Sequence, residues 1–234
     1  MRTLGWIAIG GLGVGIASLS LAYALGGRDL HRLPFDIAST ASCGESAKAG
    51  SPSVRRLAWD NGDSIELSLP GTVYFRGGQG SEVVVRGSPD LVANVEVRGR
   101  RLTLDCRGWT AGRDLEITLP GRAFRHIRVS GSGKLVMENV SQPDLDLRIS
   151  GSGSVRAQGS VDQATIKVSG SGEARLGDLA VKQLTVDISG SGKVEAAPKD
   201  TADIRISGSG DVKLLSRPAN LTSKVAGSGR ITQP

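Results

Sequence analysis

Residues 168–174 read Val-Ser-Gly-Ser-Gly-Glu-Ala, and the Ser-Gly-Ser-Gly core of this stretch occurs five times in the chain. A sixth copy, at residues 226–229, has Ala in place of the first Ser. The copies begin at Ser130, Ser150, Ser169, Ser189, Ser207 and Ala226. Successive copies are therefore 20, 19, 20, 18 and 19 residues apart. A near-constant period of this length is typical of solenoid proteins, in which one structural unit stacks on the next.

Alternating apolar and polar residues flank each copy of the motif, which is the pattern of a half-buried β-strand. In one repeat, Ile166 and Val168 precede the motif and Ala174 and Leu176 follow it. We therefore expect a strand, a glycine-rich corner, a second strand and a looser return in each repeat. Continuing the alternation through the corner places both glycines on the inside and both serines on the outside. Stacked repeats of this kind predict an all-β parallel β-helix with coils of about 19 residues.

Two outward columns of side chains are candidate binding elements. The residue between the two apolar positions before the motif is basic in five repeats and acidic in one, at Asp187. These basic residues are Arg128, Arg148, Lys167, Arg205 and Lys224. The second serines of the motif are Ser132, Ser152, Ser171, Ser191 and Ser209. A stacked positive stripe would attract an anionic envelope polysaccharide or the acidic face of another surface protein. An ordinary solvated face in a chain of net charge +6 would give the same sequence pattern and is the alternative.

A third column supports the proposed stacking. The residues directly after the motif are Lys134, Ser154, Glu173, Lys193, Asp211 and Arg230. From Glu173 onward, each charge would lie opposite its counterpart on the next coil, which disfavours a slip in register. Chance alternation on a solvated face is the alternative.

The N-terminal segment predicts export. Residues 4–24 carry no charge and are flanked by Arg2 and Arg28, which is the pattern of a cleaved signal peptide or of a helix that anchors the chain in the inner membrane. We therefore divide the chain into a signal or anchor at 1–27, a linker at 28–52 and a solenoid domain at 53–234, with the repeats at 130–229. The expected location is the periplasm or the cell envelope.

The region between the linker and the repeats is β-like but lacks the motif. Pro70-Gly71 and Pro120-Gly121 each follow an alternating run, so we expect them to replace the usual corner. Trp59 and Trp109 are expected to cap this end of the solenoid. Cys43 in the linker and Cys106 in the domain would pair in an oxidising compartment, or remain as two separate thiols.

The chain resembles a bacterial family of proposed auto-transporter adhesins, the head GIN domain family. The similarity rests on the repeated Ile/Val-Ser-Gly-Ser-Gly motif, on Trp-Asp-x-Gly-Asp at residues 59–63 and on the Leu-Pro-Gly elements, and it covers roughly residues 53–234. The resemblance implies a right-handed, pectin-lyase-like β-helix in the bacterial envelope with a role in adhesion. It brings no catalytic residues.

No motif in the sequence predicts catalysis, a cofactor or a metal. His31 and His126 have no partner nearby in sequence, and no Cys or His spacing matches a zinc site. The Gly-x-Gly pairs precede strands, whereas phosphate-binding loops precede helices. Nucleic acid is not expected, because no aromatic residues accompany the basic column. We therefore expect a non-enzymatic binding surface; the alternatives are a scaffold that assembles through an open coil edge and a polysaccharide-active enzyme. The oligomeric state stays open.

Overall fold

The computed structural model of the 234-residue chain describes residues 52–59, 62–76, 82–105, 115–120 and 123–234. Within these residues, fifteen strands form one continuous hydrogen-bonded sheet, and no helix is long and apolar enough to cross a membrane. The predicted signal or anchor, nearly all of the linker, and Cys43, Cys106 and Trp109 lie outside the described residues. The location of the protein and the proposed disulfide therefore stay predictions.

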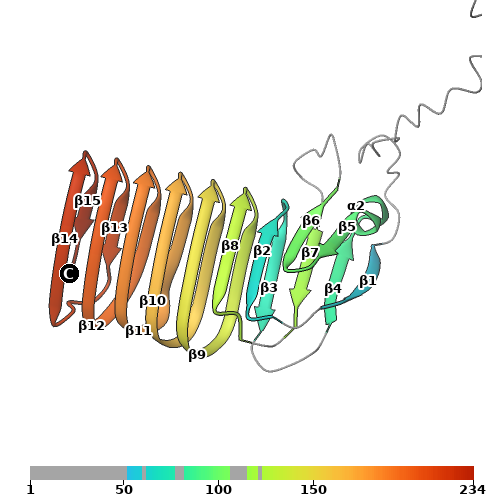
Figure 1. Cartoon of the computed structure of the whole chain (residues 1–234), viewed down its shortest axis with the longest axis horizontal. Coiled ribbons are helices and arrows are strands. Elements are labelled where there is room, and N and C mark those ends of the chain that lie inside the picture. The colour runs from blue at the N-terminus through green and yellow to red at the C-terminus, as the bar shows by residue number, and fades with distance from the viewer. Residues whose placement is uncertain (1–51, 60–61, 77–81, 106–114, 121–122) are drawn as a thin grey trace, which may run out of the picture. The chain divides into compact units, whose positions relative to one another are not determined.

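The repeats wind as a β-solenoid, as expected (Figure 1). Its strands are β8 (His126–Gly131), β9 (Lys134–Gly151), β10 (Ser154–Gly170), β11 (Glu173–Gly190), β12 (Lys193–Gly208), β13 (Asp211–Leu214), β14 (Asn220–Gly227) and β15 (Arg230–Thr232). All of these strands pair in parallel. Ser150, Ser169, Ser189 and Ser207 are direct partners, so the corners lie one above another. We call each strand position in this stack a rung.

The motif forms a tight corner in which one glycine backbone passes directly over the next. Gly170 and Gly190 have φ values of +106° and +119°, which L side chains rarely adopt. A Cβ atom on Gly190 would lie 2.6 Å from the carbonyl oxygen of Gly170. The second glycine, Gly172, is buried, whereas Gly170 is exposed. The prediction that both glycines face inward is therefore wrong for the first one, because the chain turns there with positive φ and leaves the alternating pattern.

The return at the opposite end of each coil is built differently. It is not the loose connection that we expected, because β9 to β12 run through it as continuous strands. Register shifts concentrate there, for example between Arg156 and Gly159 and between Leu176 and Ala180. The repeats differ in length by one or two residues, and these shifts absorb the difference while the motifs stay aligned.

The coils that precede the repeats are stacked out of sequence order. β2 (Ser64–Ser68) and β3 (Thr72–Arg76) pair in parallel with β8 and β9, and Gly71 forms the corner between them with a φ of +110°. On their other side, β2 pairs with β6 (Arg101–Leu104) and β3 with β7 (Leu115–Leu119). The chain thus adds an outer coil before it returns to β8. The Pro70-Gly71 corner is confirmed, whereas Gly121 of the predicted Pro120-Gly121 corner lies outside the described residues.

Antiparallel strands and a short helix cover the outer coil. β1 (Ser53–Ala58) pairs with β4 (Glu82–Gly87), β4 pairs with β7, and β5 (Val95–Arg98) pairs with β6, all antiparallel. The helix α2 (Pro89–Ala93) buries Leu91 and Val92. Trp59 is buried and stacks edge-on against Phe124 at 5.8 Å between ring centroids. A cap that includes Trp59 is therefore confirmed, and it shields the parallel edge from pairing with other strands.

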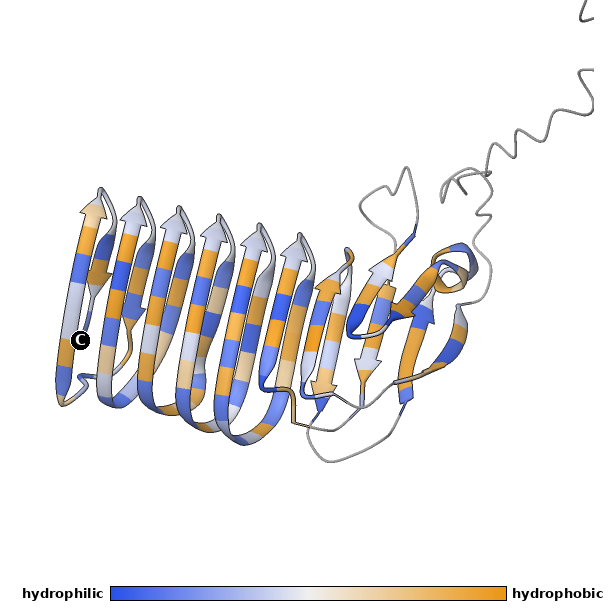
Figure 2. Ribbon diagram, in the orientation of Figure 1, coloured by the Kyte–Doolittle hydropathy of each residue, from blue (hydrophilic) through white to orange (hydrophobic). Residues whose placement is uncertain are grey.

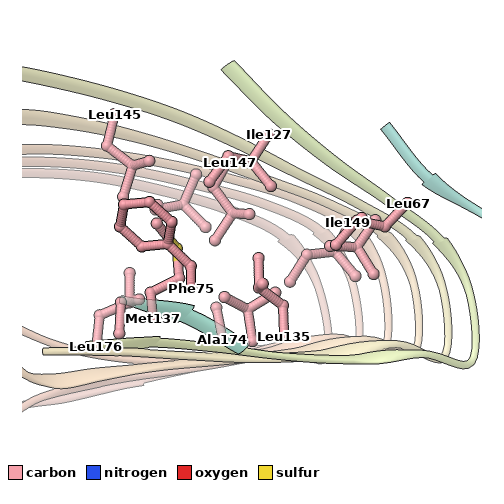
Figure 3. Packing of buried hydrophobic residues seen from close by; sticks show 14 of the residues in the cluster. Leu67, Phe75, Ile127, Leu135, Met137, Leu145, Leu147, Ile149, Ala174 and Leu176 are labelled. Carbon is pink, nitrogen blue, oxygen red and sulfur yellow. The ribbon is translucent and has the colours of Figure 1, made fainter. Parts of the chain in front are cut away.

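Aliphatic side chains fill the inside of the coils. Figure 2 shows hydrophobic and hydrophilic residues alternating along each strand, and Figure 3 shows Leu135 and Met137 on one side of the interior facing Leu147 on the other. All three are fully buried. Because the interior is packed, the described coils offer side chains to solvent only on their outward faces.

Candidate binding groove

One outward column runs along the half of each coil that precedes the motif. Strand pairing places its members at the same register on successive rungs: Arg101, Glu66, Arg128, Arg148, Lys167, Asp187, Arg205 and Lys224. Neighbouring rungs in a sheet are about 4.8 Å apart. The structure therefore brings together the five basic residues that the sequence placed in one column, and it adds Arg101 and Glu66 at the capped end.

Ion pairs divide this column into neutralised and bare positions. Asp146 accepts two hydrogen bonds from Arg148, at 3.2 Å from Nε and 2.9 Å from Nη2. Glu66 pairs with Arg101 at 3.0 Å, and Asp203 pairs with Arg205 at 2.8 Å. Within the described residues, Arg128, Lys167 and Lys224 have no carboxylate within salt-bridge distance. The column is therefore not a uniform positive stripe.

Three adjoining hollows form a shallow groove beside the column. Their volumes are about 570, 280 and 420 Å³. Glu66 lines all three, Arg100 lines the first two, and Arg128 and Arg148 line the last two. We define the cationic groove by its basic residues, which are Arg98, Arg100, Arg101, Arg128, Arg148 and Lys167. The groove reaches Asp187 on β11, so Arg205 and Lys224 lie beyond it.

A hairpin in the cap supplies the first part of the groove. β5 and β6 are joined by Gly99 and Arg100, and Gly99 has a φ of +59°. The backbone N–H of Glu66 donates to the carbonyl oxygen of Arg100 at 2.8 Å, which fixes the turn against β2. Sequence reasoning missed Arg98, Arg100 and Arg101, although a glycine-containing turn between two alternating runs is a hairpin signal.

The two serines of each motif have different surroundings. The first serines, Ser130, Ser150, Ser169 and Ser189, line the third hollow beside the column. The predicted serines at 132, 152, 171, 191 and 209 are exposed along the corner, and none of them lines the three hollows. The hydroxyl groups that accompany the cations are therefore those of the first serines.

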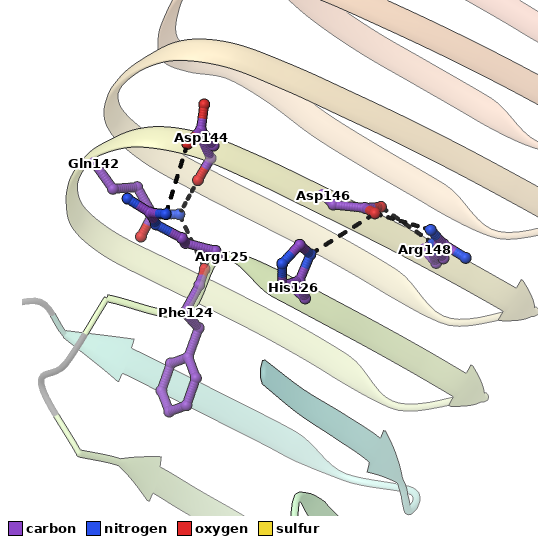
Figure 4. A network of polar contacts seen from close by, with 7 residues as sticks. All are labelled: Phe124, Arg125, His126, Gln142, Asp144, Asp146 and Arg148. Atoms are coloured by element: carbon purple, nitrogen blue, oxygen red, sulfur yellow. Dashed lines mark hydrogen bonds and ion pairs between the residues drawn. The ribbon is translucent and has the colours of Figure 1, made fainter. Parts of the chain in front are cut away.

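A polar network fixes the middle of the groove (Figure 4). His126 Nδ1 lies 3.8 Å from a carboxylate oxygen of Asp146, which also binds Arg148. The hydrogen bond from Arg148 lowers the pKa of Asp146 below its usual value, against the opposing effect of partial burial. Asp146 is therefore ionised at neutral pH and holds the guanidinium group in place. His126, for which the sequence offered no partner, is part of this network.

The chemistry of the groove is that of anion binding. Guanidinium groups offer forked donors that match carboxylates, and serine hydroxyls donate to or accept from neutral polar groups. Two acids in the groove, Glu66 and Asp146, are already bound to arginines. In the described part of the chain, no cluster of three or more His, Cys, Asp and Glu residues could hold a metal ion.

The opposite outward face has the alternating column that the sequence predicted. Lys134, Ser154, Glu173, Lys193, Asp211 and Arg230 are in register on successive rungs. Beside them, Arg175 pairs with Glu173 at 2.9 Å and Lys213 pairs with Glu195 at 3.3 Å. Most charges on this face have an opposite charge beside them, which makes it the weaker candidate for an anionic partner.

Comparisons with known proteins agree with this fold. Residues 63–218, more than half of the chain, match the family model described as "Putative auto-transporter adhesin, head GIN domain". A solved structure described as a putative adhesin from Bacteroides fragilis is 18% identical, with a TM-score of 0.60 over 78% of this chain and 97% of that one. A putative lipid binding protein from Parabacteroides distasonis is 17% identical, with a TM-score of 0.50 over 80% and 98%. Such low identities establish a shared fold alone. Comparison with curated proteins gives no match.

Proposed function

The chain belongs to the family described as "Putative auto-transporter adhesin, head GIN domain", and we propose that its cationic groove binds a linear anionic polysaccharide of the cell envelope. On this proposal the protein is a non-enzymatic binding module. Export through residues 4–24 would bring it to the compartment where such polymers occur. The right-handed winding implied by the family resemblance stays a prediction.

One observation carries the proposal: the groove is long and open, and three of its six basic residues have no acidic partner among the described residues, whereas Arg98, Arg101 and Arg148 do. Its three hollows adjoin along the stacked strands, a shape that suits an extended polymer better than a compact small molecule. In the described residues, Arg100, Arg128 and Lys167 line it without forming an ion pair. The row of first serines adds hydroxyl groups that can bind those of a sugar.

The proposal is tested by binding of the full-length protein to immobilised anionic polysaccharide and to neutral dextran, at low and high salt. We expect binding to the anionic polymer alone, and weaker binding at high salt because exposed charges are screened. Arg128→Gln should weaken binding about fivefold, as one exposed charge contact is worth roughly 1 kcal/mol.

Lys193→Gln is the matched control, because Lys193 is an exposed cation on the opposite face, between Glu173 and Asp211. This variant should bind as the unchanged protein does. Equal binding to dextran, or an equal loss in both variants, would exclude the groove as the polysaccharide site. Salt-sensitive binding to acidic surface proteins but not to polysaccharide would favour the protein partner instead.

Two further measurements on the same samples test the alternative functions, an enzyme and an assembling scaffold. New reducing ends or unsaturated products in the polysaccharide would indicate an enzyme. β14 pairs with β12 alone among the described strands and exposes Leu221 and Val225, so self-assembly would use this edge. A molecular mass that does not change with concentration would exclude the assembling scaffold.

A further inference from the structure

The bare cations of the groove occupy alternate rungs. In the order of strand pairing, the rungs are β6, β2, β8, β9 and β10. Arg100 lies on the turn into β6, Arg128 lies on β8 and Lys167 on β10, and none of the three forms an ion pair among the described residues. Arg128 and Lys167 share one register two rungs apart, which is about 10 Å, and Arg100 lies one residue before the register position that Arg101 holds on β6.

The intervening rungs carry charges that are already neutralised. Glu66 on β2 is bound at 3.0 Å to Arg101 of β6, so the column position of β6 is neutralised as well and Arg100 is the bare cation beside it. On β9, Arg148 uses its Nε and Nη2 to bind both carboxylate oxygens of Asp146. Because a contact carboxylate cancels most of the field of a guanidinium group, these rungs offer hydrogen bonds but little net positive charge.

Hydroxyl groups accompany the rungs of the third hollow from β8 onward, whether charged or neutralised. Ser130, Ser150 and Ser169 stand in direct register beside Arg128, Arg148 and Lys167. The surface therefore repeats with two periods: one rung for hydroxyl groups and two rungs for uncompensated positive charge. Asp187 on the next rung ends the pattern, since it would repel an anionic group there.

We infer that the groove selects a linear polysaccharide with a carboxylate on every second sugar, lying along the stack and across the strands. This inference rests on the proposed function. A sugar in an extended chain is about as long as one rung, so alternate carboxylates meet Arg100, Arg128 and Lys167 while neutral sugars lie over the two ion pairs. A polymer with a carboxylate on every sugar places the additional ones beside the ion pairs of Glu66 and Asp146, where they lose water without gaining a free cation.

The test compares three probes of similar length on the full-length protein at one ionic strength: hyaluronan, polygalacturonate and dextran. Hyaluronan carries a uronate on every second sugar, polygalacturonate on every sugar, and dextran carries none. Simple attraction between opposite charges favours polygalacturonate, because its charge density is higher. We expect hyaluronan to bind at least about fivefold more tightly, a difference that needs matched contacts on alternate rungs.

A substitution can then change the spacing of the cations that have no acidic partner. Asp146→Asn removes the carboxylate that neutralises Arg148 and makes the cations of β8, β9 and β10 consecutive. This variant should strengthen polygalacturonate binding more than hyaluronan binding and reduce the preference by about fivefold. Asp203→Asn is the matched control, since it breaks the same kind of pair, with Arg205, beyond Asp187. It should leave the preference unchanged.

The outcomes separate this inference from the proposed function. Equal or tighter binding of polygalacturonate to the unchanged protein would overturn the alternation and leave the polysaccharide function standing. An unchanged preference in a folded Asp146→Asn variant would also overturn it. If neither polyanion binds better than dextran, the proposed function fails. The comparison of probes on the unchanged protein needs no variant, so misfolding of Asp146→Asn would not remove the test.

Discussion

Each coil of the solenoid contains two bends that solve the same geometric problem in different ways. At the Ser-Gly-Ser-Gly corner, backbone lies directly on backbone, and a Cβ on Gly190 would lie 2.6 Å from the carbonyl oxygen of Gly170. At the return, a Cβ on Gly177 would meet the tip of the Leu215 side chain, which can move. The first glycine position of the corner therefore permits only glycine, and the corner has the same number of residues in every repeat. The return tolerates bulges.

This difference explains how binding residues on successive coils can stay in register along the stack. The column residues Arg148 and Lys167 lie two positions before the first serine of their motifs, so the rigid corner determines their register. Differences in repeat length occur at the return and do not reach the groove. Binding residues next to the corner therefore keep their spacing even when the coils differ in length.

An insertion of one residue should distinguish the two bends most strongly. Inserting Ala between Ser191 and Gly192 shifts the corner against its neighbours and moves the following side chains to the opposite face. We expect a loss of more than about 3 kcal/mol in the free energy of unfolding, because buried aliphatic side chains become exposed. Urea unfolding followed by circular dichroism measures this.

The same insertion between Lys199 and Asp200 is the control. Both residues are exposed, and β12 already has one residue more than β11 between Pro198 and Thr201. The cost should stay below about 1 kcal/mol, since the added residue can join this bulge. Similar losses from the two insertions would mean that the return determines the register as strictly as the corner does.

Substitution of single glycines gives a smaller effect in the same direction. Gly190→Ala places a methyl group against a carbonyl group at a φ of +119°, and such strain costs about 1–3 kcal/mol. Gly177→Ala meets a flexible side chain, so we expect a change within about 1 kcal/mol, and a gain is possible because Ala is less flexible when unfolded. Thermal unfolding of both variants measures which substitution destabilises the protein more.

One glycine of the return is as constrained as the glycines of the corner. Gly159 has a φ of +131°, and the backbone of Val140 leaves no room for a Cβ. The return of β10 is thus as crowded as a corner at this one position. The tolerance of the return is a property of its length and bulges, and not of every residue in it.

The sequence predicted the repeating part of the fold better than the cap, for a physical reason. In the repeats, every coil repeats the same corner and the same alternation, so the register of Arg148 and Lys167 could be deduced from the motif alone. In the cap, antiparallel pairing of β1, β4 and β5 and the out-of-order coil depend on contacts between distant segments. No local pattern records those contacts.

The groove was predicted in part, and only some of its missing features had a signal in the sequence. Asp146 and Arg148 are two residues apart on one strand, so they share a face, and the neutralisation of Arg148 could have been expected. The position of Arg100 needed the hairpin to be placed beside β2, which the sequence does not specify. The choice between the first and second serines depended on where the alternation breaks, which is at the positive φ of the first glycine.

A last pair of substitutions concerns Asn139, in the return of β9, which is exposed and has a φ of +55°. Asn tolerates this conformation, whereas a β-branched side chain does not, so Asn139→Val should cost about 1–2 kcal/mol. Asn139→Gly should change the free energy of unfolding by less than about 0.5 kcal/mol, because the easier φ is offset by greater freedom in the unfolded chain. Urea midpoints of the two variants measure both values. A loss in Asn139→Val above about 3 kcal/mol, the upper end expected for Gly190→Ala, would contradict the comparison, since the return would then be the more constrained bend.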